Sequence, residues 1–537
     1  MSAPLRLKGI SASAGYAEGP LHSLDQAGGI YSPSGMPELE KATLEAAVGA
    51  AIDGLASLIA TSEGDAAEIL EFQIAMLEDD ALTGPAFIAI SEGMAADAAW
   101  RAVLDAETAG YESSDQEYFR ARAADMRDIR DRVLRALSSE DSGSAPAGAI
   151  LYGEDIAPTR FLEIDWSHGG GIALTGGSAA SHVAMLARAR GIPMVVGLGA
   201  SDVRITGLAL LDAEHGGIVL KPSIAEIEEF RRHFGAFAAR RDKARSYLAS
   251  PAVTKNGLPI RVQVNIADPS DVDGLDIANC DGVGLMRTEF LFGHTSGLPD
   301  EETQYQAYRK VLEWAGEKSV TIRTVDAGGD KPVPGFTVEE SNPFLGLRGI
   351  RLSLARPEIF RVQIRALLRA GVHGNLKVMF PMISIPEEYD RASTLFAEEG
   401  AKLTALGVPH KLPPLGIMVE VPTVAIAPEA FSDVAFFSIG SNDLTQYVMA
   451  AARDNGAVAS LNVVRNPAVL RLIAQVAAYG TANGIPVSLC GDAGGDPATI
   501  PALLEAGLRD LSVVPAQLAM AKAAIADVPV QVPTHGR

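Results

Sequence analysis

Hydrophobic and polar positions follow three different patterns along the chain. Residues 5–21 read as a short strand–turn–strand entry. Between residues 36 and 137 glycine is rare, and Ala, Leu, Glu and Arg recur at spacings of three and four, which predicts amphipathic helices. A polar linker at 138–148 ends that region. Beyond it, short apolar runs between glycine turns predict the strands of a compact α/β region, at 149–152, 171–174, 193–196 and 209–212.

From residue 259 onward, short apolar runs alternate with helical segments. Eight such units fit into fewer than 300 residues, which is the pattern of a (β/α)8 TIM barrel. In that fold the active site lies at the C-terminal ends of the strands. The predicted strands are 260–266, 282–286, 320–326, 376–381, 415–419, 434–439, 486–489 and 510–514.

These patterns predict an α/β multidomain protein. We expect an α/β domain from residues 1–35 and 138–222, interrupted by a helical domain at 36–137. Residues 223–250 predict a helical linker, which Pro251 closes. The barrel then occupies 251–537.

One histidine lies where a helix of the α/β domain is expected to begin. Ser181 is a good N-cap, 183–190 reads as a helix, and Gly191 is suited to close it. The unpaired N–H groups and the positive dipole end of that helix suit an anion on the imidazole of His182. A phosphorylated histidine fits this setting. An ordinary capping histidine fits it equally well.

Charged residues follow the predicted barrel strands and are expected to converge on one mouth. Glu420 and Asp443 are hard oxygen ligands of the kind that Mg²⁺ prefers. Cys490 offers a thiol that can exchange a proton with carbon. Each residue has a structural explanation when taken singly, but together they describe a pocket for a small phosphorylated acid bound through Mg²⁺. Four arginines there can fork onto phosphate or carboxylate oxygens: Arg287, Arg323, Arg348 and Arg453.

Composition restricts the partners and the compartment. The chain carries 45 Lys and Arg against 67 Asp and Glu, a net charge of −22. This acidity argues against nucleic acid or an anionic membrane and favours a basic protein partner. Two cysteines cannot form a disulfide framework, which indicates a reducing compartment. With no apolar run of transmembrane length and no signal-peptide core, we expect a cytoplasmic protein without membrane insertion.

Two helical segments allow alternative interpretations. In 67–80 the apolar residues cover more than one face, so either another protein packs on this helix or the helix is fully internal. In 115–137, arginines alternate with Asp125, Asp128 and Asp131, which predicts a solvated face with ion pairs.

Five motifs in a fixed order resemble enzyme I of the bacterial phosphoenolpyruvate-dependent phosphotransferase system. The resemblance extends from Gly9 to about Val514 and includes the helix at 68–80. The motifs are Gly176-Gly-Ser-Ala-Ala-Ser-His182, Gly282-Val-Gly-Leu-Met-Arg-Thr-Glu-Phe-Leu-Phe292, Arg323-Thr-Val-Asp-Ala-Gly-Gly-Asp-Lys331, Asn342-Pro-Phe-Leu-Gly-Leu-Arg348 and Phe436-Phe-Ser-Ile-Gly-Ser-Asn-Asp-Leu-Thr-Gln-Tyr447.

The resemblance implies that phosphoenolpyruvate phosphorylates His182 and leaves as pyruvate, after which a histidine of the carrier HPr takes the phosphoryl group. It implies that the helical domain docks HPr, that the barrel binds phosphoenolpyruvate and forms a homodimer, and that the histidine domain swivels between them. Members of the nitrogen branch commonly carry an N-terminal sensory domain. This sequence lacks one, so we expect a role in sugar transport.

The resemblance also assigns roles to single residues. Cys490 protonates the methylene carbon of the substrate. The remaining assignments are Arg287 and Arg323 to the phosphoryl oxygens, Lys331 and Arg348 to their support, Asn442 and Arg453 to the phosphate and carboxylate end, and Glu420 and Asp443 to Mg²⁺.

Four residues depart from the usual motifs of this family, and two rival interpretations remain. Ala157 and Ala180 replace hydroxyl residues, Ala452 replaces an aspartate, and Asp492 replaces a glutamate. A pyruvate, phosphate dikinase or phosphoenolpyruvate synthase would need a nucleotide-binding domain before the histidine domain, and the first 140 or so residues lack a glycine-rich phosphate loop. A regulatory docking protein of the same fold, without turnover, is the other alternative.

Overall fold

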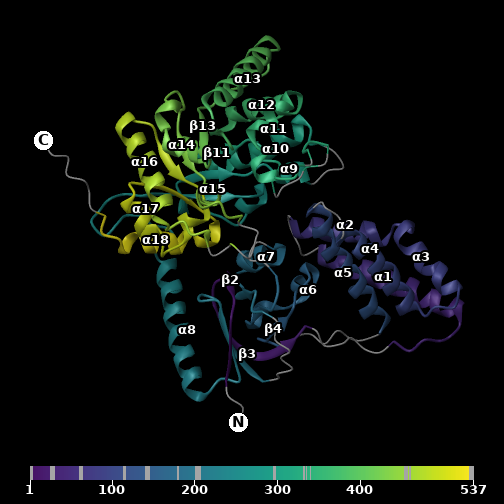
Figure 1. The fold of residues 1–537 in the computed structure, drawn as a ribbon. Helices are drawn as coiled ribbons and strands as arrows, with labels where there is room; N and C mark the ends of the chain where they lie inside the picture. Colours follow the sequence, from purple (N-terminus) through teal and green to yellow (C-terminus); the bar gives the residue numbers. More distant parts are fainter. Residues whose placement is uncertain are drawn as a thin grey trace. The chain divides into compact units, whose positions relative to one another are not determined.

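A computed structural model describes most of the chain. The chain divides into two compact units, Met1–Phe237 and Ala238–Arg537, and each is described by itself (Figure 1). The described residues are 4–24, 31–59, 65–112, 117–138, 146–177, 181–199, 207–293, 298–329, 333, 335–338, 340–452, 458 and 461–530.

The first unit is built on an eight-stranded sheet with the order β1-β8-β7-β3-β4-β5-β6-β2. The central strands β3 to β6 run parallel to one another, and the remaining pairs are antiparallel. The predicted strands of the α/β region are confirmed, but the sequence analysis missed β8. The strands are β1 (Leu5–Lys8), β2 (Ile10–Ser13), β3 (Tyr16–Ser23), β4 (Ile150–Gly153), β5 (Gly171–Leu174), β6 (Met194–Val196), β7 (Leu208–Asp212) and β8 (Gly217–Leu220).

The described residues between β3 and β4 form five helices, in the region where the sequence predicted an inserted helical domain. The two strands flanking the insertion are paired neighbours, with Leu21 opposite Ile150. The helices have their own core, which includes Leu44, Leu55 and Trp100, and Figure 1 shows them gathered in one bundle. They are α1 (Pro37–Ile59), α2 (Asp65–Leu77), α3 (Asp80–Ser91), α4 (Ala96–Glu112) and α5 (Glu117–Leu137).

Helix α2 is not fully internal. Leu70 and Leu77 are buried in the helical core, whereas Ala75 is exposed and Phe72 and Ile74 are half-buried. Ile74 packs partly against that same core, and α2 exposes Glu71 and Ala75 to solvent. Of the two interpretations offered for this segment, the internal helix is therefore wrong.

The solvated face predicted for α5 is wrong at Asp128. This carboxylate is 3% exposed and accepts hydrogen bonds from the Thr159 hydroxyl at 2.6 Å and from the Gln73 amide at 3.0 Å. Burial raises the pKa of Asp128. Arg130 does form the expected surface ion pairs, with Asp131 at 2.7 Å and Asp105 at 2.5 Å. Asp128, one position of the alternating pattern, therefore lies in the protein interior rather than in solvent.

Among the described residues, α1 is the one helix long and apolar enough to cross a membrane by length and composition alone. The sequence analysis did not single it out because Glu45 and Asp53 interrupt the apolar run. Leu44 and Leu55 on α1 are fully buried in the core of the bundle. We therefore interpret α1 as a core helix of the bundle.

The described part of the first unit also contains α6 (Pro158–Glu163), α7 (His182–Arg190) and, up to Phe237, the first part of α8 (Ile224–Arg245). Aromatic rings fix the first half of α8 to the sheet. The ring of Tyr16 on β3 lies 5.5 Å from that of Phe230 and 5.3 Å from that of Phe237. Residues 238–245 are mostly exposed. The anchored part of α8 therefore ends near Phe237.

The second unit contains a closed barrel of eight parallel strands, and the predicted TIM barrel is confirmed. Each predicted run contains one strand, although β11 ends at Arg323 and β14 begins only at Phe437. The strands are β9 (Arg261–Ile266), β10 (Gly282–Met286), β11 (Ser319–Arg323), β12 (Asn375–Phe380), β13 (Leu415–Val419), β14 (Phe437–Ile439), β15 (Val487–Leu489) and β16 (Asp510–Val513).

Helices follow the barrel strands and surround them in Figure 1. Their apolar faces and the outward strand residues form the largest core of the protein. The helices are α9 (Phe290–Gly293), α10 (Glu301–Ala315), α11 (Ile350–Ala355), α12 (Pro357–Ala370), α13 (Pro386–Ala405), α14 (Pro422–Ile426), α15 (Ser441–Met449), α16 (Pro467–Asn483), α17 (Ile500–Glu505) and α18 (Leu518–Asp527).

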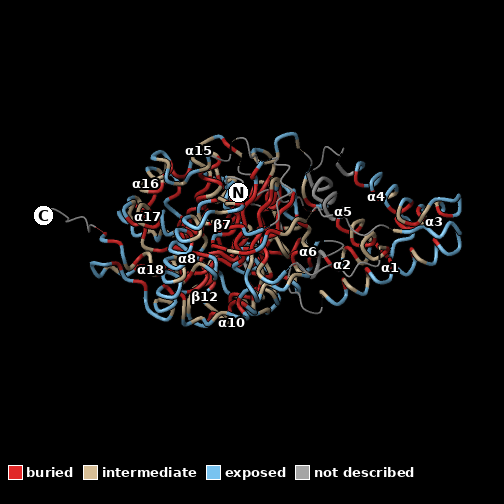
Figure 2. Tube along the Cα trace, turned by 90° about the horizontal axis from the view of Figure 1, so that it is seen from below, coloured by how far each residue is buried: buried red, intermediate tan, exposed pale blue. Residues whose placement is uncertain are grey.

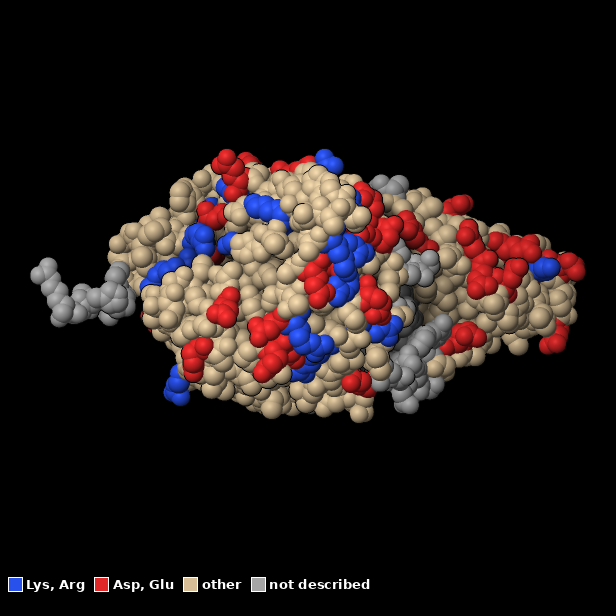
Figure 3. Space-filling model, turned by 90° about the horizontal axis from the view of Figure 1, so that it is seen from above, with Lys and Arg blue, Asp and Glu red and all other residues tan. Residues whose placement is uncertain are grey.

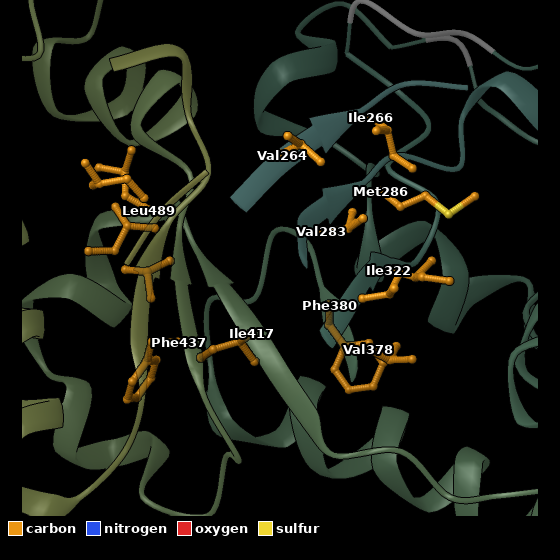
Figure 4. Packing of buried hydrophobic residues seen from close by; sticks show 14 of the residues in the cluster. Val264, Ile266, Val283, Met286, Ile322, Val378, Phe380, Ile417, Phe437 and Leu489 are labelled. Carbon is orange, nitrogen blue, oxygen red and sulfur yellow. The ribbon is translucent and has the colours of Figure 1, made fainter. Parts of the chain in front are cut away.

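Side chains alternate between the two faces of the barrel wall. Residues such as Ile417 and Phe437 pack against the helices (Figure 4), and most residues of the barrel strands are buried (Figure 2). The inward positions form a separate layer, in which Met379 and Met418 pack with Cys490. Other inward positions are polar, and the Gln263 amide donates to the Ser319 hydroxyl at 3.1 Å. The interior is thus filled rather than open.

Candidate active site

The strands of the barrel present their charged residues at one end, which we call the mouth. Parallel strands end together, so residues just after them converge. Arg323 ends β11, Glu420 follows β13, and Cys490 follows β15. Every described barrel residue proposed from the sequence lies at this end: Arg287, Arg323, Arg348, Glu420, Asn442, Asp443 and Cys490.

Three residues proposed from the sequence cannot be placed at the mouth. Lys331 and Arg453 lie outside the described residues. His182 belongs to the first unit, where its backbone begins α7 and its side chain is outside the description. Their roles remain predictions.

Two buried arginines at the mouth share a carboxylate that the sequence analysis did not assign. Arg323 Nη1 lies 3.1 Å from Asp326 Oδ2, and Arg348 Nη2 lies 2.9 Å from the same oxygen. Glu289 Oε2 also pairs with Arg323 Nη2 at 3.0 Å, and Asp443 Oδ1 lies 3.5 Å from Arg348 Nη1. Burial alone would lower the pKa of both guanidinium groups, but the neighbouring carboxylates outweigh it and hold these pKa values above their ordinary value.

Glycine makes the approach of Arg348 possible. Gly328 has φ +104°, and a Cβ at this position would lie 2.6 Å from the Cβ of Arg348. Any larger residue would be strained in its own backbone and would push Arg348 away. The Gly-Gly pair of the Arg323–Lys331 motif therefore has a local reason: it lets the segment after β11 wrap closely around Arg348.

A polar network holds the end of β11. The Thr288 hydroxyl donates to the carbonyl of Arg323 at 3.0 Å, and Gln363 Oε1 accepts from the N–H of Val325 at 3.0 Å. Glu289 Oε1 accepts from the N–H of Asp326 at 2.9 Å. These contacts fix the backbone on both sides of the Arg323 side chain. Sequence reasoning missed Gln363, because its partner lies 38 residues away on another element.

Glu420 and Asp443 form a buried carboxylate pair. Glu420 is 1% exposed, and its Oε1 accepts from the N–H of Met382 at 2.6 Å. Burial, followed by the charges of Asp443 and Asp326, raises the pKa of Glu420 above its ordinary range. A Cβ at Gly440 would lie 3.1 Å from Glu420 Oε2, so the glycine keeps the space beside that oxygen clear.

This pair fits a divalent cation. Two neighbouring carboxylates repel each other, and a metal ion bound between them offsets that repulsion. Among the described residues no group of three or more His, Cys, Asp or Glu side chains could hold a metal. A cation here would therefore complete its coordination with substrate and water oxygens, as Mg²⁺ commonly does.

The thiol of Cys490 is suited to remain protonated. The residue is 3% exposed, and its Sγ donates to the carbonyl of Ile439 at 3.6 Å. Burial raises the pKa of the thiol to about 11, against the opposing effects of the Ser438 hydrogen bond and the charges of Arg323 and Arg287. Cys490 is therefore a thiol, rather than a thiolate, at neutral pH.

Three family models match successive parts of the chain. "PEP-utilising enzyme, N-terminal" matches residues 8–122, "PEP-utilising enzyme, mobile domain" matches 145–216, and "PEP-utilising enzyme, PEP-binding domain" matches 241–530. The phosphoenolpyruvate-protein phosphotransferase of Bacillus subtilis is 36% identical over 523 residues, covering 94% of this chain and 92% of that protein. The chain belongs to the phosphoenolpyruvate-protein phosphotransferase family.

Other relatives agree with this assignment. The phosphoenolpyruvate-protein phosphotransferase of Listeria monocytogenes is 37% identical over 462 residues, 84% of this chain and 80% of that protein. An NMR structure of an enzyme I protein covers 43% of this chain at 24% identity, with a TM-score of 0.35 that is too low to support an argument. The predicted family and enzyme class, a phosphotransferase that uses phosphoenolpyruvate, are confirmed.

The departures from the usual phosphotransferase motifs have visible local effects. Asp492 accepts from the Asn442 amide at 3.0 Å, and its own N–H donates to Asn442 Oδ1 at 3.2 Å. This reciprocal pair fixes which way the amide of Asn442 points. Ala157 is the N-cap of α6 and supplies no side-chain hydrogen bond there. Ala180 lies outside the described residues.

The helix that begins at His182 has the capping that the sequence predicted. The Ser181 hydroxyl accepts from the N–H of Ala184 at 3.2 Å, and Gly191 closes α7 with φ 67°. Backbone N–H groups of the first turn and the positive helix dipole therefore lie at the residue that the phosphotransferase motif singles out.

Proposed function

We propose that this chain transfers a phosphoryl group from phosphoenolpyruvate to His182, releases pyruvate, and then passes the group to a histidine of HPr. The observation that supports this best is the grouping at one mouth of Arg323 and Arg348, a buried carboxylate pair and a protonated thiol. Arginines bind the anion, and the thiol supplies the proton that turns an enol into a ketone.

Each step balances in bonds and protons. The P–O bond of phosphoenolpyruvate breaks, and a P–N bond forms at His182, whose lone pair attacks. Arg287, Arg323 and Arg348 neutralise the charge on the phosphoryl oxygens. Cys490 gives its proton to the methylene carbon, and the resulting thiolate regains a proton from solvent. Glu420 and Asp443 would hold Mg²⁺, which supplies charge neutralisation of the substrate when bound.

The remaining proposed roles concern substrate orientation. Asn442 and Arg453 bind the phosphate and carboxylate end, and Lys331 supports the phosphoryl site. The ring of hydrogen bonds between Asn442 and Asp492 leaves one N–H of the amide for an anion.

The helical domain is the proposed docking surface for HPr. Residues 36–137 contain twenty-one acidic and eight basic residues, and Asp and Glu dominate the face of the bundle seen at the right of Figure 3. Such a surface attracts a basic partner. The half-buried apolar residues of α2 would form the centre of the interface.

We further propose that residues 1–35 and 138–222 act as a swivelling unit, with 36–137 as the HPr-binding domain, 223–250 as linker and 251–537 as a barrel that forms the homodimer. The anchoring of α8 by Tyr16 and Phe237 supports a hinge after Phe237. A second hinge is proposed near 138–148, of which 139–145 lie outside the described residues. The compartment proposed is the cytoplasm.

Labelled phosphoenolpyruvate tests this proposal. With Mg²⁺ and no nucleotide, an acid-labile label should appear on the wild-type protein and not on a His182→Ala variant. Absence of label on the wild type would favour the non-catalytic docking protein instead. Adding purified sugar-branch or nitrogen-branch HPr to the labelled protein would show which carrier removes the label.

A further inference from the structure

Asp326 holds two guanidinium groups that would otherwise repel each other. Its side chain is 1% exposed, and those of Arg323 and Arg348 are 5% and 0% exposed. Because both nitrogens contact the same carboxylate oxygen, they lie within about 6 Å of each other. Two buried cations at this separation are stable only with an anion between them.

Asp326 engages Arg348 along one edge. Its Oδ2 accepts from Arg348 Nη2 at 2.9 Å, and its Oδ1 lies 3.4 Å from Arg348 Nε. An edge-on pair fixes the plane of the guanidinium as well as its position. The opposite edge of Arg348 is occupied, because its Nη1 donates to the Tyr447 hydroxyl at 3.3 Å. Arg323 Nε is buried and makes no hydrogen bond among the described residues, so this N–H can donate to another anion.

A competing partner lies on the other side of Arg348. Asp443 Oδ1 is 3.5 Å from Arg348 Nη1, a longer contact than that with Asp326. Without the charge of Asp326, Arg348 would turn toward Asp443 and Arg323 toward Glu289. The two arginines would then separate.

We propose that Asp326 is a positioning residue that clamps Arg323 and Arg348 side by side, so that together they receive the phosphate of phosphoenolpyruvate. This inference rests on the function proposed above. Asp326 acts through the arginines and does not itself touch the substrate.

The test compares two neutralised carboxylates in the full-length protein. Asp326→Asn is expected to weaken phosphoenolpyruvate binding by about 10- to 100-fold, measured by calorimetry with Mg²⁺ present in a His182→Ala background, where no phosphoryl transfer follows binding. Asp510→Asn is the matched control, because Asp510 is also buried and paired with an arginine, Arg261, at the opposite end of the barrel. The Asp510→Asn variant should bind phosphoenolpyruvate as tightly as the wild type does. If the loss of any buried ion pair weakened binding, the affinity would fall in both variants.

A double-mutant cycle distinguishes an effect of Asp326 on the orientation of Arg348 from an effect on the stability of the protein. In an Arg348→Lys background, which lacks the fork, Asp326→Asn should cost much less affinity than in the wild type. An equal fold-loss in both backgrounds, or binding by Asp326→Asn within about twofold of the wild type, would overturn the proposal.

If Asp326→Asn does not fold, Asp326→Glu gives the answer. This variant keeps the charge, but its side chain is one methylene longer than the one whose Oδ2 contacts both Arg323 and Arg348. The longer side chain must move its carboxylate, so weaker binding is expected and unchanged binding contradicts the clamp. If the wild type itself neither binds phosphoenolpyruvate nor labels His182, the proposed function fails and the inference fails with it.

Discussion

Charge is buried at both ends of the barrel, in two different ways. At the N-terminal end, Asp510 on β16 pairs with Arg261 on β9, and the side chain of Arg261 remains 55% exposed. Here one buried carboxylate pairs with one arginine that remains solvated. At the mouth, Arg323 and Arg348 are both buried among Glu289, Asp326, Glu420 and Asp443.

The difference separates stability from function. A single pair joins the first and last strands of the barrel, and its cost is the desolvation of one carboxylate, because its arginine stays solvated. A dense cluster of buried charges, by contrast, costs several kcal/mol in desolvation of each ion, and such clusters are typical of binding and catalytic sites. Two pairs of substitutions, one member at each end, and the pH dependence of Asp510 test whether this separation holds.

The largest effect is expected for the two buried cysteines. Cys490→Ala should lower the rate of pyruvate formation about 100- to 10,000-fold, because a methyl group cannot donate a proton. Cys280, which precedes β10 at the opposite end and is 2% exposed, provides the control Cys280→Ala, whose rate should not change. Coupled pyruvate assays give both rates. Equal rates for the two variants would remove Cys490 from the mechanism.

Two glycines come next. Gly328→Ala should displace Arg348 and raise the KM for phosphoenolpyruvate about 100-fold, as expected for a binding group moved by an ångström. Gly282→Ala, at the start of β10, meets the same steric problem against the carbonyl of Ser319 and has φ +124°. There we expect a loss of about 1–3 kcal/mol in stability and an unchanged KM. Thermal unfolding and substrate titration of both variants measure the contrast; a raised KM for Gly282→Ala would contradict it.

The smallest effect concerns pH and Asp510. Burial raises the pKa of Asp510 from 3.8 to about 6. Between these values the unfolded chain has released the proton and the folded chain has kept it, so stability from this group falls as pH rises. Relative to Asp510→Asn, the wild type should lose roughly 2–3 kcal/mol between pH 4 and pH 7. Denaturant unfolding at several pH values measures this difference, and a constant difference would contradict the shift.

Much of the barrel could be predicted because its outward residues are apolar. Runs such as Leu415–Val419 show this face directly. The inward face was harder to see. In Arg261-Val-Gln-Val-Asn-Ile266 the polar residues alternate with valines, which indicates an interior position for Gln263 and Asn265 once a barrel is assumed. That alternation was present in the sequence and was not used.

The sequence predicts which residues belong to the candidate site better than it predicts which side chains contact them. Arg323 and Glu420 are recognisable because they end strands. The carboxylate of Asp326 lies in a quoted motif, but its role depends on Arg348, 22 residues further on. Asp128 was misplaced for a similar reason, since its partners Gln73 and Thr159 lie 55 and 31 residues away. Contacts between distant elements leave no local pattern.

The sheet of the first unit can be completed only late in the synthesis of the chain. Strand β1 pairs with β8, from Leu5 opposite Leu220 to Lys8 opposite Gly217, so β1 must wait for its partner until about two hundred further residues have been synthesised. The inserted helices make mostly local contacts and can form earlier. A nascent chain stopped before Gly217 should therefore hold a folded bundle beside an unfinished sheet, which exposes an unpaired edge to chaperones and to other copies.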